Sequence, residues 1–318
     1  MDNYEITVED TAPRAAPRPA ARPTPPPSRL AVLRRRMHAV KARVLPFWPI
    51  LRLVGFFGAV AIVVYMGVQA GRDVHPSDLE LWPLGIALVG AGAWWLGLGR
   101  GWSLILDGRT AWSDISVWCR TQALRFLPGG FWAPASRVFV VHGTPLDRLA
   151  TVAGENVLAL SAALTIGGVA LAVSGRPLWA GLAVALAAPL AGAHVLRGKI
   201  RITKTRATTA TVNYVLAFTA YAVAAVLVQL AVSGHVDPAD VAGAAAVAWA
   251  AGLVVVIAPS GVGVREWVYV KLLAGTLPHA QLEAAAVTMR LVMIVAECVI
   301  LVIVGRPGRQ SPPEQLRR

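Results

Sequence analysis

The feature that most constrains this chain is a series of apolar runs long enough to cross a lipid bilayer. A membrane-spanning helix needs about 20 mostly apolar residues. Runs close to this length occupy residues 53–70, 81–99, 149–173, 178–196, 210–232 and 282–304. Because hydrocarbon offers the backbone no hydrogen-bond partner, such segments must pair their own polar groups. Runs of this length therefore predict transmembrane helices.

Composition agrees with a membrane protein. Of the 318 residues, 56% are hydrophobic and only 15% are charged, whereas a soluble domain has roughly 25% charged residues. The formal charge of +13 would suggest a nucleic-acid partner on a soluble chain. Here the basic residues lie mainly in tails and loops, where they set topology. We expect a disordered, Pro/Arg-rich tail over residues 1–46, a membrane domain over 47–305 and a short tail over 306–318.

The apolar sequence after residue 241 is interrupted by the stretch Pro259-Ser260-Gly261-Val262-Gly263-Val264-Arg265-Glu266-Trp267. Pro259, Gly261 and Gly263 break a helix and free backbone groups that the helix would have paired. An ionisable residue at membrane depth costs roughly 2.5–3.5 kcal/mol on insertion scales. We therefore expect this stretch to be buried in protein or to line a wet cavity, within a re-entrant helical hairpin.

A second break follows the apolar segment 112–127. Pro128, Gly129 and Gly130 separate it from the segment 134–142, and neither segment is long enough for a comfortable crossing. We interpret this region as another re-entrant hairpin, which enters and leaves the membrane on one face. The predicted fold is thus all-α, with about six transmembrane helices and two re-entrant hairpins.

The distribution of basic residues predicts the orientation. With a cytoplasmic N-terminus and two re-entrant hairpins, 21 of the 30 Lys and Arg residues lie on the cytoplasmic side and three lie outside. This excess obeys the positive-inside rule. If only one hairpin crossed the membrane, the C-terminal tail would lie outside. If both crossed, the basic loop 197–206 would lie outside. We therefore predict a multi-pass protein of the cell (cytoplasmic) membrane with both termini in the cytoplasm.

This topology contains an internal repeat. The order span, span, hairpin, span occurs over residues 47–174 and again over 175–305, and the two units have opposite orientations. An inverted-topology repeat of this kind is common in secondary transporters. The local sequences agree loosely, since a Pro/Gly break precedes Arg137 in the first unit and Arg265 in the second.

Four arginines in the membrane domain are candidates for a substrate site: Arg265, Arg137, Arg290 and Arg125. The guanidinium group is a planar fork that fits phosphate, so we interpret them as binding an anionic headgroup. Three acidic residues are candidates for ion pairing or proton coupling: Glu266, Glu155 and Glu297. The alternative is structural: Arg–Glu pairs would tie the hairpins to neighbouring spans, and Arg125 would extend to the cytoplasmic face.

Other residues in the spans have simpler interpretations. Trp82, Trp94 and Trp95 are expected at the membrane interfaces. Polar residues such as Asn213 and Gln229 hold helices together, and the glycines between residues 85 and 99 allow close helix packing. The chain has no Walker, nucleophile-elbow or zinc-hydrolase motif and no Asp-rich metal cluster. We therefore expect no enzyme activity, no cofactor and no metal, and the sequence indicates no particular oligomeric state.

The stretch Pro259–Glu266 resembles the P-x-G-G-x-G-x-R-E signature of the lysylphosphatidylglycerol synthase transmembrane region family. Leu127-Pro128-Gly129-Gly130 with Arg137 is similar to the motif in the first half of that family. Ser260 stands where the family has glycine, and Glu155-Asn156 stands where members often have Glu-Arg. The resemblance covers about residues 47–305 and is to a stand-alone member without the aminoacyltransferase domain.

The resemblance implies transbilayer movement of an anionic lipid or a polyprenyl-phosphate-linked intermediate. The expected partners are therefore membrane lipids, with a glycosyltransferase or lipid-synthesis enzyme as a further partner. The alternative is an accessory membrane subunit that moves no lipid and scaffolds a lipid or glycan biosynthetic enzyme. A third alternative, an enzyme acting on lipid phosphate, lacks a recognisable nucleophile or metal site.

Overall fold

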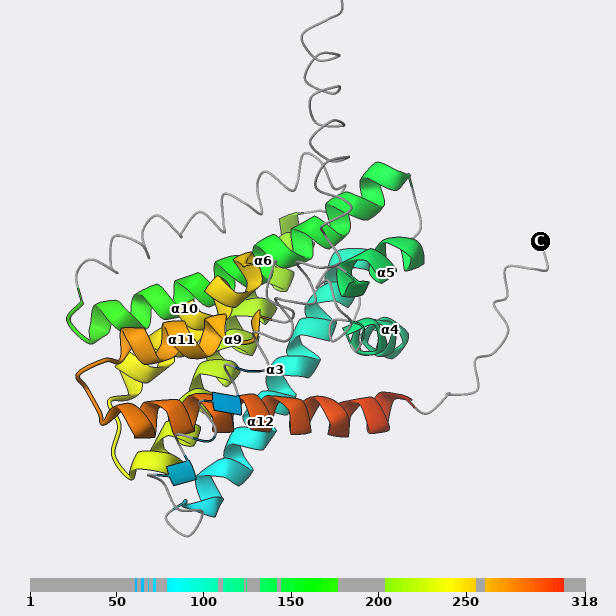
Figure 1. Cartoon of the computed structure of the whole chain (residues 1–318). Helices are drawn as coiled ribbons and strands as arrows, with labels where there is room; N and C mark the ends of the chain where they lie inside the picture. Colours follow the sequence, from blue (N-terminus) through cyan, green and yellow to red (C-terminus); the bar gives the residue numbers. More distant parts are fainter. Residues whose placement is uncertain are drawn as a thin grey trace, which may run out of the picture. The chain divides into compact units, whose positions relative to one another are not determined.

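The computed structural model describes residues 79–107, 111–122, 132–141, 144–176, 204–255 and 261–305, together with Leu124 and isolated positions between 61 and 72. Within these residues the ordered elements are helices, and one isolated bridge joins Ala274 to Leu277. The helices are α3 (Leu81–Asp107), α4 (Trp112–Gln122), α5 (Trp132–Val140), α6 (Pro145–Val173), α9 (Lys204–Ser233), α10 (Pro238–Val254), α11 (Val264–Leu272) and α12 (His279–Gly305) (Figure 1). The predicted all-α class is confirmed for this part of the chain.

Four of these helices, α3, α6, α9 and α12, are long and apolar enough to cross a membrane. They contain the predicted spans 81–99, 149–173, 210–232 and 282–304, and each helix extends beyond the predicted span at one or both ends. The predicted spans 53–70 and 178–196 lie largely or wholly outside the described residues. The chain therefore carries several candidate membrane-spanning helices, as expected for a multi-pass membrane protein.

Local sequence explains where α6 and α10 begin. The Thr144 hydroxyl accepts a hydrogen bond from the backbone N–H of Asp147, whose carboxylate accepts one from the Thr144 N–H. This is a capping box, and it satisfies donors that the first helical turn leaves unpaired. Asp237 caps α10 in a similar way by accepting from the N–H groups of Ala239 and Asp240. A proline occupies the first position of both helices, where its missing N–H costs nothing.

Glycines bring α3 and α9 into close contact. A Cβ added at Gly97 would lie 2.7 Å from the Cβ of Ala217, and one added at Gly90 would lie 3.3 Å from the Cβ of Ala224. The Asn213 amide donates a hydrogen bond of 2.6 Å to the carbonyl oxygen of Gly97 across the same contact. These observations confirm for Gly90 and Gly97, but not for Gly85, that the glycines serve close helix packing, and they confirm that Asn213 holds two helices together.

The contacts between the described helices show how the bundle is packed. The short helices form two neighbouring pairs, α4 with α5 and α10 with α11. Figure 1 shows α6, α10 and α11 side by side. The principal contacts are α3 with α4, α6, α9 and α12; α9 with α6, α10 and α12; α10 with α6 and α11; α4 with α5 and α12; α5 with α6; and α11 with α12.

A cluster of aromatic rings lies among α3, α9 and α10. The expectation that Trp94 and Trp95 lie at a membrane interface was wrong, because both side chains are only 2% exposed. Trp94 packs against Tyr221 and Trp249, at ring-centroid distances of 5.1 and 6.3 Å. The sequence position near the middle of α3 did not distinguish a side chain facing neighbouring helices from one facing lipid. Trp82, in the first turn of α3, is 60% exposed, and its interfacial position stays a prediction.

The close contact between α3 and α9 gives a test of the packing. Replacing Gly97 by Leu should destabilise the protein by about 1–3 kcal/mol, because the added atoms overlap α9. The same change at Gly85 is the control, since nothing lies within 4 Å of a Cβ added there. The thermal unfolding midpoint of the detergent-solubilised variants measures the difference. Equal midpoints for the two variants would contradict this packing.

Candidate functional site

Helix α11 begins at a glycine-rich turn that brings it close to α10. Gly261 and Gly263 have positive φ angles of 66° and 81°, a region that favours glycine. A Cβ added at Gly261 would lie 2.7 Å from the Cα of Gly252 on α10. Gly261 and Gly263 thus interrupt the helix as predicted, and they allow two backbones to approach where no side chain fits. Pro259 lies outside the described residues.

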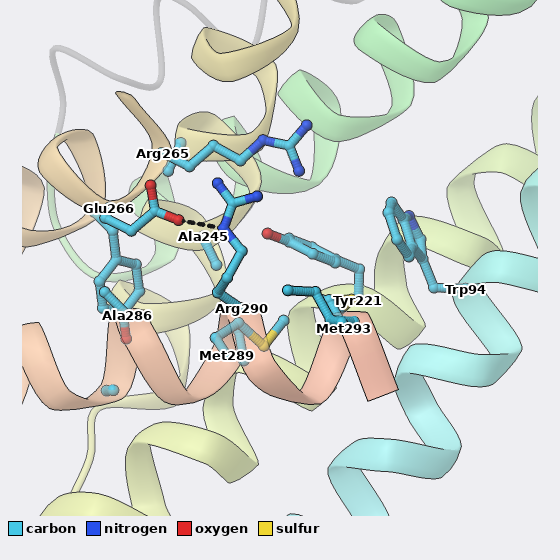
Figure 2. Close-up of a pocket in the computed structure, with 14 residues that line it drawn as sticks. Trp94, Tyr221, Ala245, Arg265, Glu266, Ala286, Met289, Arg290 and Met293 are labelled. Atoms are coloured by element: carbon cyan, nitrogen blue, oxygen red, sulfur yellow. Dashed lines mark hydrogen bonds and ion pairs between the residues drawn. The ribbon is translucent and has the colours of Figure 1, made fainter. Parts of the chain in front are cut away.

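This turn places Arg265 and Glu266 against a pocket of about 660 Å³, its open mouth included. The lining residues come from five helices and are Trp94, Tyr221, Ala225, Ala245, Ala248, Arg265, Glu266, Tyr269, Ala285, Ala286, Met289, Arg290, Met293 and Ile294. Most of the lining is apolar. Figure 2 shows the side chains of Arg265 and Arg290 directed into the same region, with the hydroxyl end of Tyr221 turned toward Arg290.

Glu266 joins two sides of the pocket, and each of its carboxylate oxygens accepts a hydrogen bond within the protein. One carboxylate oxygen accepts a hydrogen bond of 2.7 Å from Nε of Arg290, and the other accepts one of 2.7 Å from the N–H of Gly263. The residue is buried. Glu266 therefore joins the start of α11 to α12 and fixes the position of the Arg290 guanidinium.

The two arginines present hydrogen-bond donors in the pocket. Nη2 of Arg290 is buried and has no hydrogen-bond partner in the described structure. The Arg265 guanidinium lies over the Trp249 ring, 5.5 Å from its centroid, where the ring face favours a cation. Buried polar groups normally have partners, so an unpartnered guanidinium nitrogen indicates a place where an acceptor binds.

A second charged cluster surrounds Arg137. Its guanidinium nitrogen Nη1 lies 2.6 Å from a carboxylate oxygen of Glu155, and both side chains are buried. The indole N–H of Trp118 donates to the same oxygen at 2.6 Å. The guanidinium also lies 5.6 and 5.7 Å from the ring centroids of Trp102 and Trp118. Arg137 is thus enclosed by aromatic rings and paired with one acid.

The two clusters share one pattern of elements. In each, an arginine on a short helix lies by a tryptophan of the preceding helix: Arg137 with Trp118, and Arg265 with Trp249. In each, the short helix also makes an ion pair with the long helix that follows it. The charges of the pair are reversed, because α5 contributes the arginine of its pair whereas α11 contributes the glutamate.

The structure divides the predicted site residues into two groups. It brings Arg265, Glu266 and Arg290 together at one pocket, and it places Arg137 and Glu155 in the other cluster. Glu297 is buried on α12, two turns beyond Arg290, and does not line the pocket. The other predicted residues lie outside the described part of the chain: Arg125, Pro128, Gly129 and Gly130.

Sequence reasoning missed the aromatic residues of the pocket. Trp94, Tyr221 and Tyr269 come from three different helices, and nothing in their spacing indicates that they meet. Gln229 gave a usable signal as a polar residue in an apolar span. It accepts a hydrogen bond of 2.8 Å from the Tyr269 hydroxyl and so joins α9 to α11. This confirms the expectation that Gln229 holds helices together.

Arg176 is a further residue whose position the sequence did not indicate. Its guanidinium forms an ion pair of 2.8 Å with Asp240 in the first turn of α10. It also donates a hydrogen bond of 2.7 Å to the carbonyl oxygen of Leu272, the last residue of α11. One side chain therefore joins the end of α6 to both ends of the α10–α11 pair.

Comparison with known proteins adds no identification. Neither the protein-family models nor the curated proteins compared with the chain gave a match. Among the described residues, no group of three or more His, Cys, Asp or Glu side chains is placed to hold a metal ion. The family resemblance of the Pro259–Glu266 stretch stays a prediction.

The buried Arg137–Glu155 pair gives a stability test. Glu155→Gln should destabilise the protein by roughly 3–5 kcal/mol, because it leaves the arginine charge buried without its partner. Replacing both residues by Met should restore much of that loss, since neither charge then remains. Thermal unfolding of the solubilised protein measures both effects.

The control is Glu283→Gln, which removes the partner of the largely exposed His279 and should change stability by no more than about 0.5 kcal/mol. If the double Met variant were no more stable than Glu155→Gln, the single change would not be acting through an unpaired charge.

Proposed function

We propose that this protein moves an anionic lipid, or a polyprenyl-phosphate-linked intermediate, across the cell membrane by alternating access. The observation that carries the proposal is the pocket between α11 and α12. It holds two arginines and one glutamate, and the two oxygens of that glutamate are already hydrogen-bonded within the protein. Such a pocket offers donors to an anion, and its alanine, methionine and isoleucine walls suit hydrocarbon chains.

The lengths of the short helices support two re-entrant hairpins. Helices α5 and α11 have nine residues each, which corresponds to about 14 Å of rise, whereas the hydrocarbon core is about 30 Å thick. The contacts of Arg176 with Asp240 and Leu272 hold the start of α10 and the end of α11 at one end of the bundle. Both observations favour a hairpin that enters and leaves on one face.

A similar argument supports the first hairpin. The N–H of Glu80, just before α3, donates a hydrogen bond of 3.1 Å to the carbonyl oxygen of Ala231 near the end of α9. The start of α3 and the end of α9 therefore share a face. If residues 178–196 cross the membrane as the sequence predicts, the chain returns to that face only when the segment from α4 to α5 makes no net crossing.

The contact scheme of the helices supports an inverted repeat. Exchanging α3 with α9, α4 with α10, α5 with α11 and α6 with α12 turns the set of principal contacts into itself. The same exchange relates the Arg137–Glu155 pair to the Glu266–Arg290 pair. Repeats of this kind place a substrate site at the interface between halves, and rocking of one half against the other gives alternating access.

Topology is tested by labelling introduced cysteines in a background with Cys119 and Cys298 replaced by Ser. His235→Cys, between α9 and α10, and Ala274→Cys, after α11, should both react with a membrane-impermeant maleimide on intact cells. Thr205→Cys, at the start of α9, should react only after permeabilisation, since the positive-inside rule places it in the cytoplasm. Labelling of positions 235 and 274 from opposite faces would mean that α10–α11 crosses the membrane.

Transport is tested with the full chain reconstituted in liposomes that contain a headgroup-labelled anionic lipid. Arg265→Ala should lower the rate of transbilayer movement by about tenfold or more, the effect of losing one hydrogen bond between charged groups. Arg120→Gln is the matched control because Arg120 lies on α4 outside the pocket lining, and its rate should stay within about twofold of wild type.

Absence of transport by the wild-type protein would contradict the proposal and favour the accessory-subunit alternative. In that case deletion of residues 1–30 should abolish function in the cell while the membrane domain remains folded. Equal transport by wild type and Arg265→Ala would show that the pocket does not carry the substrate.

A further inference from the structure

Trp94 brings to the pocket a hydrogen-bond donor that the predicted arginine site did not include. We infer that its indole N–H is a headgroup-binding group, which donates a hydrogen bond to an oxygen of the anionic lipid. This inference rests on the proposed function of the same pocket and adds a residue to its binding site. Three observations carry it: an indole N–H without a partner, a ring held in one orientation, and an example of the same donors elsewhere in the protein.

The first observation is the state of the Trp94 side chain. Trp94 lies on α3 and lines the pocket together with Arg265 and Arg290. Its side chain is buried, and its indole nitrogen has no hydrogen-bond partner in the described structure. A buried indole N–H usually finds an acceptor. The unpartnered N–H at a pocket wall therefore indicates a place where an acceptor oxygen binds.

The second observation is that the Trp94 ring is held in place. Figure 2 shows it beside Tyr221, on the side of the pocket opposite Glu266. Its ring contacts are with Trp95, Tyr221, Phe218 and Trp249, at centroid distances of 5.4, 5.1, 6.2 and 6.3 Å. This packing keeps the ring from turning its N–H toward another acceptor. A donor that is already oriented loses little entropy when a ligand binds.

Arg290 supplies a second donor of the same kind from the other side of the bundle. Its Nη2 is buried without a partner, while its Nε pairs with Glu266 and so fixes the guanidinium. Trp94 and Arg290 lie on α3 and α12, which pack against each other. An oxyanion such as phosphate has several acceptor oxygens, so it can accept hydrogen bonds from both side chains.

The third observation is the way in which Glu155 is bound in the other charged cluster. One of its carboxylate oxygens accepts from Nη1 of Arg137 and from the indole N–H of Trp118, both at 2.6 Å. A guanidinium and an indole together thus bind an oxyanion between packed helices of this protein. In the pocket, Nη2 of Arg290 and the N–H of Trp94 are the corresponding donors, and the ligand supplies the oxyanion.

Two lipids with the same acyl chains test the inference on the purified full-length protein. Dioleoylphosphatidylglycerol has an anionic phosphate, and dioleoylglycerol has none. Native mass spectrometry measures their relative dissociation constants for wild type and for Trp94→Phe, which keeps an aromatic ring and loses the N–H. The variant should bind phosphatidylglycerol about tenfold more weakly, the effect of one hydrogen bond to a charged group. Its affinity for dioleoylglycerol should stay within about twofold of wild type.

The matched control is Trp102→Phe. Trp102 also lies on α3 and is buried with an unpartnered indole N–H, but it does not line the pocket. This variant should bind phosphatidylglycerol within about twofold of wild type. Unchanged phosphatidylglycerol binding by Trp94→Phe would overturn the inference. An equal loss for both lipids would also overturn it, because Trp94 would then act through packing alone.

A second variant keeps the test decisive if Trp94→Phe does not fold. Trp94→benzothienylalanine preserves the size of the ring and replaces the N–H by sulfur. It should show the same selective loss of phosphatidylglycerol binding, and wild-type affinity would overturn the inference. Soluble glycerophosphoglycerol distinguishes a lipid headgroup from a free phosphodiester. Weak competition by it supports the lipid, whereas competition as strong as that of phosphatidylglycerol would overturn the lipid assignment.

These binding measurements are separate from transport. A protein that moves no lipid but loses phosphatidylglycerol affinity selectively in Trp94→Phe would contradict the proposed function and leave this inference standing. A protein whose transport depends on Arg265, and whose phosphatidylglycerol affinity is the same in wild type and Trp94→Phe, would support the proposed function and overturn this inference.

Discussion

The cost of an unpaired charge among packed helices is the constraint on which this arrangement depends. Nη1 of Arg137 lies 2.6 Å from a carboxylate oxygen of Glu155, and Nε of Arg290 lies 2.7 Å from a carboxylate oxygen of Glu266. Removal of one partner from such a pair costs much more than the intact pair contributes. Each pair therefore holds a nine-residue helix, too short to be stable alone, against a long apolar helix. The main role of the ion pairs is therefore to hold α5 and α11 in place.

Aromatic rings occupy the space between the two charged clusters. The ring of Trp118, which faces Arg137, lies 5.0 Å from that of Trp95, which lies 5.4 Å from Trp94. Trp94 in turn packs against Trp249, whose ring faces Arg265. Large rings with few rotatable bonds order at a low entropic cost. The continuous series of ring contacts connects the two arginines through a stiff, close-packed region.

The sequence predicted the elements better than the contacts between them. Apolar length located α3, α6, α9 and α12, and the Gly261–Gly263 break located the start of α11. The cost of an ionisable residue in the membrane marked Arg265 and Arg290 as site candidates, and the structure places both at one pocket. Their binding role stays a prediction. The ion-pair partner of each charged residue could not be predicted from the sequence, because Glu266 and Arg290 lie 24 positions apart on different helices. The prediction for Trp94 was wrong for a related reason. An apolar span has no polar face that would show which of its sides packs against other helices.

The difference between the two clusters matters for the proposed transport. The Arg137–Glu155 pair is neutral, so that cluster can be enclosed by protein without a ligand. In the pocket beside α11, the Glu266 carboxylate is paired with Arg290, whereas the Arg265 guanidinium lies over the Trp249 ring. A ligand shifts an equilibrium between two conformations only if it contacts the protein differently in each of them. Under the proposed function, an anionic headgroup held by these arginines would have to be that ligand.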